Sequence, residues 1–138
     1  MAPSLTLRVI TPDRIVLDET VESVRMPGAD GSLGVLPRHA HLVTALDAGA
    51  LVYETPGGDR KELFVSGGFA EVRDDTVRVV TEASEPISAI DIERAREAER
   101  RARERISAIR TGVSSEDLLR AEASLRRALL RLRLKGEG

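Results

Sequence analysis

Both histidines of the chain lie two residues apart, in the segment GSLGVLPRHAHLV of residues 31–43. Imidazole binds transition metals and transfers protons near neutral pH, so His39 and His41 are the first candidates for chemistry. On a strand, residues two apart project from the same face, and we expect both rings on one face. A zinc-type site needs three or four converging ligands, however. The chain has no third histidine and no cysteine, so we predict no metal site. A small histidine-metal sandwich protein stays an alternative.

Signatures of catalysis are missing elsewhere in the sequence. There is no Gly-x-Ser-x-Gly nucleophile elbow, no GxGxxG and no GxxxxGK[ST] phosphate loop, and these are the common motifs of hydrolases and nucleotide enzymes. Aromatic residues make up only 2% of the chain, whereas proteins that bind single-stranded nucleic acid stack bases on aromatic rings. The sequence therefore favours an interaction protein over an enzyme, and we expect no nucleic-acid partner.

The length of 138 residues allows one domain and an appendage. No run of 18 apolar residues occurs, and the opening MAPSLTLRVI lacks the basic start of a signal peptide. We expect an intracellular protein without a membrane span.

The first half of the chain has the period of two that is typical of strands, with Gly, Pro and Asp at the turns. The expected strands are LTLRVI (5–10), RIVL (14–17), VESVRM (21–26), ALVYE (50–54), ELFV (62–65), AEV (70–72) and TVRVV (76–80). The segment ETPGGDRKELF predicts a hairpin, and Gly67-Gly68 predicts a bulge or tight bend. Together they predict a β-sandwich or flattened barrel over residues 1–86.

The second half favours helices. Residues 89–110 and 115–135 contain no Gly or Pro and are rich in Ala, Leu, Glu and Arg. Gly112 can end the first helix, and Ser114 with Asp117 resembles a capping box for the second. Because the linker is short, the two helices should form an antiparallel hairpin over residues 87–138. The predicted fold class is therefore α+β, an N-terminal sandwich followed by a C-terminal two-helix hairpin.

Helical spacing predicts the seam between the two helices. The first helix contributes Ala95, Ala98, Ala102, Ile106 and Ile109, and the second contributes Leu118, Ala121, Leu125, Ala128 or Leu129, and Leu132. Each buried CH₂ is worth about 0.8 kcal/mol, so a seam of Ala holds less tightly than one of Leu. We expect a hairpin that can open or leave the sandwich.

Charge divides along the same boundary. Residues 1–88 carry eight basic and 14 acidic side chains, a net charge of −6, and residues 89–138 carry 13 and nine, a net charge of +4. A basic hairpin after an acidic sandwich favours an acidic partner for the helices. The alternative is that the arginines only solvate the helix surface.

Two segments resemble the epsilon subunit of bacterial-type rotary, proton-translocating ATP synthases. The first family segment, Gly-x-(Leu/Met)-Gly-(Val/Ile)-x-Pro-x-His-Ala-Pro-Leu, is matched at Gly31, Leu33, Gly34, Val35, Pro37, His39, Ala40 and Leu42. The second, Ser-Gly-Gly-x-x-Glu-Val, is matched at Ser66, Gly67, Gly68, Glu71 and Val72. The chain departs from the pattern at Ser32, where many relatives have an acidic or amide residue, and at His41, where they have Pro. The likeness extends in order along essentially the whole chain.

The resemblance implies a non-catalytic subunit of the central stalk, peripheral on the cytoplasmic face of the bacterial membrane. It implies that the sandwich binds the gamma subunit and the ring of c subunits and rotates with them, which helps to couple proton-driven rotation to ATP synthesis. The rotor-docking residues would be Gly31, Ser32, Leu33, Pro37, His39 and Leu42. His39 would then be a contact residue, and the alternative is a histidine hydrogen-bonded within its own loop.

The resemblance also implies that the hairpin is regulatory. Folded, it lies against the sandwich; extended along gamma, it enters the alpha/beta catalytic hexamer and inhibits ATP hydrolysis. Basic residues of the last helix would then face an acidic segment of the beta subunits. The candidates for this contact are Arg126, Arg133 and Lys135, together with Arg120, Arg127 and Arg131.

Some bacterial relatives bind ATP in the folded hairpin through the motif (Ile/Leu)-Asp-x-x-Arg-Ala. IDIERA matches this motif with Ile90, Asp91, Arg94 and Ala95. Carried over, the pocket also includes Glu85, Arg120, Arg127 and Arg131. Steps of seven and four place the three arginines on one helical face, and guanidinium groups suit bidentate contact with phosphate. ATP would be a regulatory ligand and no required cofactor. A purely mechanical stalk subunit, with Asp91 as a helix N-cap and Arg94 on the surface, is the alternative.

Overall fold

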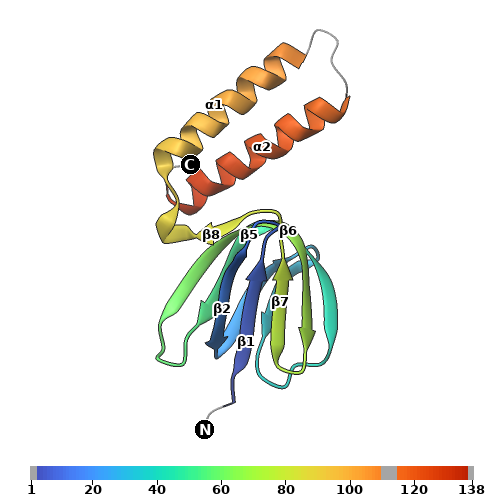
Figure 1. The fold of residues 1–138 in the computed structure, drawn as a ribbon, viewed down its shortest axis with the longest axis vertical. Helices are drawn as coiled ribbons and strands as arrows, with labels where there is room; N and C mark the ends of the chain where they lie inside the picture. Colours follow the sequence, from blue (N-terminus) through green and yellow to red (C-terminus); the bar gives the residue numbers. More distant parts are fainter. Residues whose placement is uncertain (1–2, 110–114, 137–138) are drawn as a thin grey trace. The chain divides into compact units, whose positions relative to one another are not determined.

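The computed structural model describes residues 3–109 and 115–136. The chain divides into two compact units, Met1–Pro86 and Ile87–Gly138. The first unit consists of strands and the second of helices, which confirms the predicted fold class (Figure 1). None of the helices within the described residues is long and apolar enough to cross a bilayer.

Eight strands make up the first unit. They are β1 (Leu5–Ile10), β2 (Ile15–Val21), β3 (Ser23–Gly28), β4 (Gly31–Val35), β5 (Leu42–Glu54), β6 (Arg60–Arg73), β7 (Thr76–Val80) and β8 (Ser84–Pro86). Their hydrogen-bonded order is β2-β1-β7-β6-β5-β3-β4, and β8 pairs with β6. β1 and β7 run parallel, whereas β5 and β6 form the predicted antiparallel hairpin from Glu54 to Arg60. The sheet folds over so that β1, β2 and β7 form one layer and β5 lies behind them (Figure 1).

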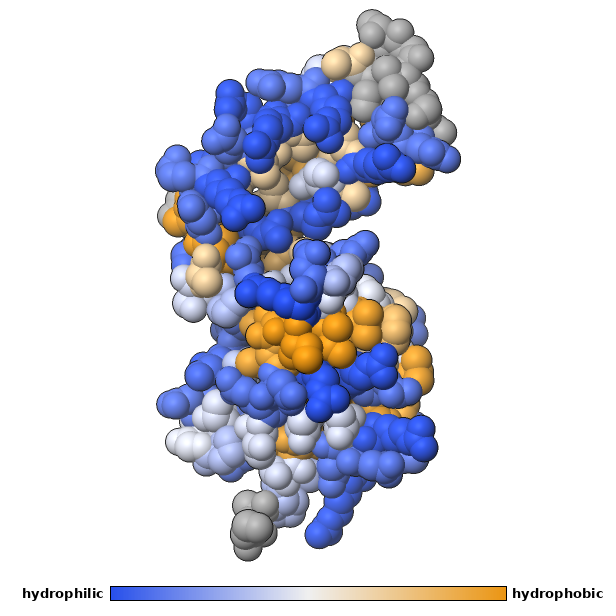
Figure 2. Space-filling view, in the orientation of Figure 1, coloured by the Kyte–Doolittle hydropathy of each residue, from blue (hydrophilic) through white to orange (hydrophobic). Residues whose placement is uncertain are grey.

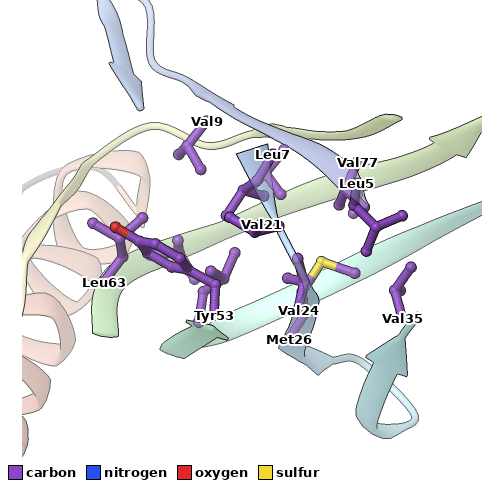
Figure 3. Close-up of a cluster of buried hydrophobic side chains, with 14 of the residues drawn as sticks. Leu5, Leu7, Val9, Val21, Val24, Met26, Val35, Tyr53, Leu63 and Val77 are labelled. Atoms are coloured by element: carbon purple, nitrogen blue, oxygen red, sulfur yellow. The ribbon is translucent and has the colours of Figure 1, made fainter. Parts of the chain in front are cut away.

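The core lies between these layers and is aliphatic. β1 alternates buried and half-buried residues, as its sequence predicts, so that Leu5, Leu7 and Val9 point inward. Figure 3 shows them meeting side chains of β3 and β5, among them Met26 and Tyr53. Burial, and then the negative charge of Glu19, raise the pKa of the Tyr53 hydroxyl above its ordinary value, so this group stays neutral inside the core.

The segment with the two histidines is not a strand, so the expectation that both rings project from one strand face was wrong. β4 ends at Val35 and β5 begins at Leu42, and His39 and His41 lie in the loop between them. Pro37 interrupts the strand pattern because it lacks an amide hydrogen. Arg38 follows with a φ of 67°, a left-handed conformation that no regular strand contains.

A bend at Gly67 and Gly68 lets the 14-residue strand β6 pair with two different strands. Before the bend, Leu63–Val65 pairs with β8, and after it Phe69–Arg73 pairs with β7. Both glycines have a positive φ, of 110° and 102°, which residues with a side chain rarely adopt. A Cβ at Gly68 would lie 2.0 Å from the carbonyl oxygen of Val80. The predicted bend is therefore present, and it requires Gly68.

The second unit starts with a short 3₁₀ turn, η1 (Ile87–Ala89), followed by α1 (Ile92–Ile109) and α2 (Ser115–Leu134). The predicted end of the first helix at Gly112 and the capping residue Ser114 lie outside the described residues. At the far end, the Gly136 amide donates to the Arg133 carbonyl at 3.0 Å, and Gly136 has a φ of 85°. This is the left-handed glycine that commonly ends a helix.

Five of the predicted seam residues between α1 and α2 are buried, and four of these are alanine. The buried residues are Ala95, Ala102, Ala121, Ala128 and Leu132. Ala98, Ile106, Leu118 and Leu125 are half-buried, and the side chain of Ile109 lies outside the described residues. Of the two alternatives at one position, Ala128 faces the seam and Leu129 is 38% exposed. On the outer surface, α1 carries the ion pairs Glu97–Arg100 and Glu99–Arg103. Such exposed pairs contribute little stability, and they show that part of the arginine content serves the helix surface itself.

We predict that Gly68→Ala lowers the free energy of unfolding by roughly 3 kcal/mol or more, because it adds a clash with Val80 to the strain of a positive φ. Gly58→Ala is the matched control, since Gly58 also has a positive φ, of 88°, but faces open space. This control should lose only about 1–2 kcal/mol. Urea denaturation of the full chain measures both values, and equal losses would contradict the account of the bend.

Candidate functional site

The two histidines of the loop between β4 and β5 form hydrogen bonds to different parts of the chain. The Nδ1 of His39 donates to the carbonyl oxygen of Ala40 at 2.7 Å, whereas Nε2 of His41 donates to Oδ1 of Asp74 at 3.3 Å. The backbone amide of His39 also donates to the Leu36 carbonyl at 3.2 Å. Within the described residues no group of three His, Asp or Glu side chains is placed to hold a metal ion. The loop lies at the protein surface, and the ring of His39 forms a hydrogen bond within its own loop.

The predicted docking residues lie close together in the sequence but differ in how far they are exposed. Gly31 and Ser32 are exposed at the start of β4, where Ser32 Oγ accepts a hydrogen bond from Nη1 of Arg25 at 3.2 Å. Pro37 and His39 are half-buried in the loop. Leu33 and Leu42, by contrast, pack partly against the core.

Two exposed apolar side chains were not recognised from the sequence, one in the loop and one at the start of β5. Leu36 is 64% exposed and Val43 is 68% exposed. Neither position is specified by the family segment. The signal for Val43 would have been its neighbour Leu42, because adjacent strand residues face opposite ways and only one of the pair can join the core.

An apolar row crosses the outer surface of the sandwich. We define it as Ile15, Ile10, Val80, Phe69 and Ala45, one residue from each of five neighbouring strands. Each is the registered partner of the next, and paired residues share one face of a sheet. Ile15 is 59% and Phe69 44% exposed, and Figure 2 shows the apolar area over the ends of β1 and β7. Beside Phe69 and Ile10 the surface is hollowed, with Pro12 and Thr81 in the lining.

The residues of the nucleotide motif lie at the start of α1 and along α2, and Glu85 lies in β8. Ile90 is buried and Arg94 exposed, and Oδ1 of Asp91 accepts a hydrogen bond from the Arg94 amide at 3.1 Å. Asp91 is therefore the N-cap of α1, which was one of the two roles that the sequence allowed for it.

The three motif arginines of α2 differ in exposure. Arg120 is exposed, whereas Arg127 and Arg131 are half-buried, and Nη2 of Arg127 donates to Ser124 Oγ at 3.2 Å. The stretch of α2 from Arg127 to Arg131 thus carries two guanidinium groups that are partly shielded from solvent.

The three residues predicted for the inhibitory contact fall into two groups. Arg126 and Arg133 are exposed. Lys135, in contrast, directs its Nζ to the carbonyl oxygens of Ile87 at 3.1 Å and Ser88 at 2.9 Å. These carbonyls belong to η1, so Lys135 joins the end of α2 to the start of the unit.

Comparison with known proteins identifies the family. The family model for the β-sandwich domain of the ATP synthase delta/epsilon chain matches residues 4–87, and the model for the long α-helix domain of the same chain matches residues 88–136. This chain belongs to the ATP synthase delta/epsilon chain family. The family membership confirms the predicted resemblance and the expectation of a non-catalytic subunit.

Relatives named ATP synthase epsilon chain match over nearly their whole length. The chain is 46% identical to one from Nitratidesulfovibrio vulgaris strain DP4, over 99% of this chain and 98% of the relative. It is 45% identical to one from Desulforapulum autotrophicum, over 96% of both chains.

Solved structures agree with this assignment. A chain of the Euglena gracilis mitochondrial ATP synthase, solved as OSCP, F1 and c-ring, superposes with a TM-score of 0.68 at 25% identity, covering 99% of this chain and 80% of that one. A chain of the central stalk and c-ring of the Tetrahymena thermophila mitochondrial enzyme superposes with a TM-score of 0.56 at 13% identity, over 95% and 96%. At that identity the second likeness concerns the fold alone.

We predict that Lys135→Gln loosens the hairpin of this epsilon-type chain, because it removes an ammonium group that bonds two carbonyl oxygens. Charge-assisted bonds of this kind contribute about 1–2 kcal/mol when partly exposed. Hydrogen exchange of the α2 amides should speed up by roughly fivefold or more, since 1.4 kcal/mol corresponds to tenfold. Arg133→Gln, two residues earlier in the last turn of α2 and exposed, is the control. Unchanged exchange in Lys135→Gln would contradict a closing role for this residue.

Proposed function

We propose that this chain is a central-stalk subunit of a bacterial ATP synthase, located at the cytoplasmic face of the membrane. Its sandwich binds the gamma subunit and the c-subunit ring and turns with them, so that proton-driven rotation is coupled to ATP synthesis. The Euglena gracilis structure, which contains the c-ring, supports this assembly for a chain of the same fold at 25% identity.

The apolar row is the observation that carries the docking proposal. Exposed apolar residues scattered singly are ordinary on a protein surface, but a continuous patch marks an interface. Here the sheet register aligns Ile15, Ile10, Val80 and Phe69 side by side. Because the strands are fixed by the core beneath them, the patch is rigid, and little conformational entropy is lost when a partner covers it. We assign the row to the gamma subunit. The loop with Leu36 and His39, together with Val43 of β5, we assign to the c-ring.

The hairpin, in the same proposal, inhibits ATP hydrolysis when it extends into the alpha/beta hexamer. Two features support this. Four of the five buried seam residues are Ala, and the larger Ile106, Leu118 and Leu125 are only half-buried, so apolar contact holds the folded hairpin less strongly than a seam of buried Leu would. The exposed Arg126 and Arg133 supply positive charge on the helix that would face acidic groups of the beta subunits.

ATP binding to the folded hairpin is a second candidate function. It is favoured by the IDIERA motif together with the partial burial of Arg127 and Arg131. A guanidinium group in a less polar environment interacts more strongly with phosphate than one in bulk water. The alternative is a stalk subunit that does not sense ATP, and titration with nucleotides distinguishes the two.

The docking proposal predicts that Phe69→Asp weakens binding of the full-length chain to a complex of gamma and c-ring by about 30-fold, as expected for an apolar anchor at an interface centre. Lys61→Asp, at the other end of β6 and also exposed, should change the affinity by less than about threefold. Surface plasmon resonance with the immobilised complex measures both. Equal affinities for Phe69→Asp and the unaltered chain would remove the row from the interface.

The ATP proposal predicts saturable binding of ATP to the isolated chain, tighter than binding of ADP, and lost in Arg127→Ala. Isothermal titration calorimetry with ATP, ADP and MgATP measures this directly. Arg126→Ala is the matched control, because Arg126 precedes Arg127 but is exposed and lies off the motif face. If no heat of binding is detected at millimolar ATP, the hairpin is governed by contacts with the rotor alone, and Asp91 and Arg94 serve only the start of α1.

A further inference from the structure

The loop between β4 and β5 is tied to the turn between β6 and β7, more than 30 residues further along the chain. The backbone amide of Arg38 donates to Oδ1 of Asp75 at 2.6 Å. His41, at the other end of the loop, donates from Nε2 to Oδ1 of Asp74 at 3.3 Å. One turn thus holds the loop at two points.

The turn that supplies both carboxylates is itself firmly placed. Arg73 pairs with Thr76, so Asp74 and Asp75 alone connect β6 to β7. Both have a positive φ, of 49° and 60°, which is the geometry of the tight hairpin turn that Asp and Asn tolerate. The carbonyl oxygen of Asp75 also accepts a hydrogen bond from the Thr6 amide of β1 at 2.9 Å. The turn is therefore fixed to the core strands on either side.

The loop, in contrast, contains a strained residue at the point of attachment. Arg38 has a φ of 67°, a conformation that is unfavourable for a residue with a Cβ and persists only where the surroundings hold it. Two contacts hold it. The amide of His39 donates to the Leu36 carbonyl at 3.2 Å and closes a turn around Arg38, and the amide of Arg38 itself donates to the Asp75 carboxylate, a short and charge-assisted bond. Among the described residues, only the Asp75 bond joins this turn to the neighbouring strands, so without that acceptor we expect the turn to move relative to the sandwich.

We propose that Asp75 is a positioning residue for rotor docking, with Asp74 and His41 as a second, weaker attachment. The two acidic residues hold the loop so that Leu36 and His39 are presented to the rotor before it arrives, beside Val43 at the start of β5. The ordering of the loop then takes place during folding and does not weaken association. This inference rests on the docking function proposed above. It adds to the docking segment a turn that lies outside both family segments matched by the sequence.

The charges around the turn fit this role. Oδ2 of Asp74 lies 3.6 Å from Nε of Arg73, so one cation of β6 balances the carboxylate that faces His41. Asp75 is half-buried, whereas Asp74 is exposed. The Asp75 bond is thus the better shielded of the two, and its removal should have the larger effect.

The test compares Asp75→Gly with Asp75→Asn in the full-length chain. Glycine is favoured at this turn position and preserves the hairpin, but it has no acceptor. Asparagine retains Oδ1 and tolerates a positive φ, but it has no charge. We expect Asp75→Gly to bind the immobilised gamma and c-ring complex about tenfold more weakly than the unaltered chain, and Asp75→Asn to stay within about threefold. The ¹⁵N–¹H resonance of Arg38 should shift in Asp75→Gly, while the melting temperatures of the two variants agree.

Other outcomes overturn the inference in distinguishable ways. Unchanged binding of Asp75→Gly would show that the loop needs no attachment. Equal weakening in both variants would mean that the carboxylate charge meets the rotor directly and does not position the loop. Leu36→Asp is the control for docking itself: if it weakens binding and Asp75→Gly does not, only the positioning role fails. If neither variant weakens binding, the loop is not part of the docking surface.

Discussion

The missing side chain at Gly68 is the constraint on which the rest of the sandwich depends. The carbonyl oxygen of Val80 occupies the place of a Cβ there, so β6 can bend and approach β7 closely. Because of the bend, one strand pairs first with β8 and then with β7. The second pairing sets Phe69 beside Val80 and aligns the apolar row. It also places the Asp74–Asp75 turn at the end of β6, where its carboxylates reach the docking loop.

The two units are held by unequal amounts of apolar contact, and this difference suits them to different tasks. The sandwich buries Leu, Val, Met and Tyr side chains almost completely, whereas four of the five buried residues in the hairpin seam are Ala. Burial of a Leu side chain stabilises by about 1.5–3 kcal/mol and burial of an Ala methyl by much less. A rigid sandwich presents a preformed surface to a partner. A weakly held hairpin can exchange its internal contacts for external ones, with the Lys135 bonds among those that must break.

The sequence predicted what depends on neighbouring residues. Alternation identified β1, the turn residues identified the hairpin before Arg60, and helical spacing identified Ala102 and Ala121 as seam residues. It failed where structure depends on residues far apart. Pro37 is a local sign that the strand is interrupted, but the attachment of Arg38 depends on an acceptor from Asp75, and no local pattern reveals that partner. The acceptors of Lys135 lie 47 and 48 residues away, and a basic residue near a helix end gives no sign of such partners.

The central claim is that the sandwich binds the rotor and the hairpin regulates hydrolysis. The most direct measurement is the rate of ATP hydrolysis by the complete ATP synthase reconstituted with the full chain or with residues 1–86 alone, the unit that contains the whole aliphatic core. We predict that the shortened chain remains in the assembly and that the rate of ATP hydrolysis rises severalfold. Equal hydrolysis rates with the shortened chain bound, or loss of the shortened chain from the assembly, would contradict this claim.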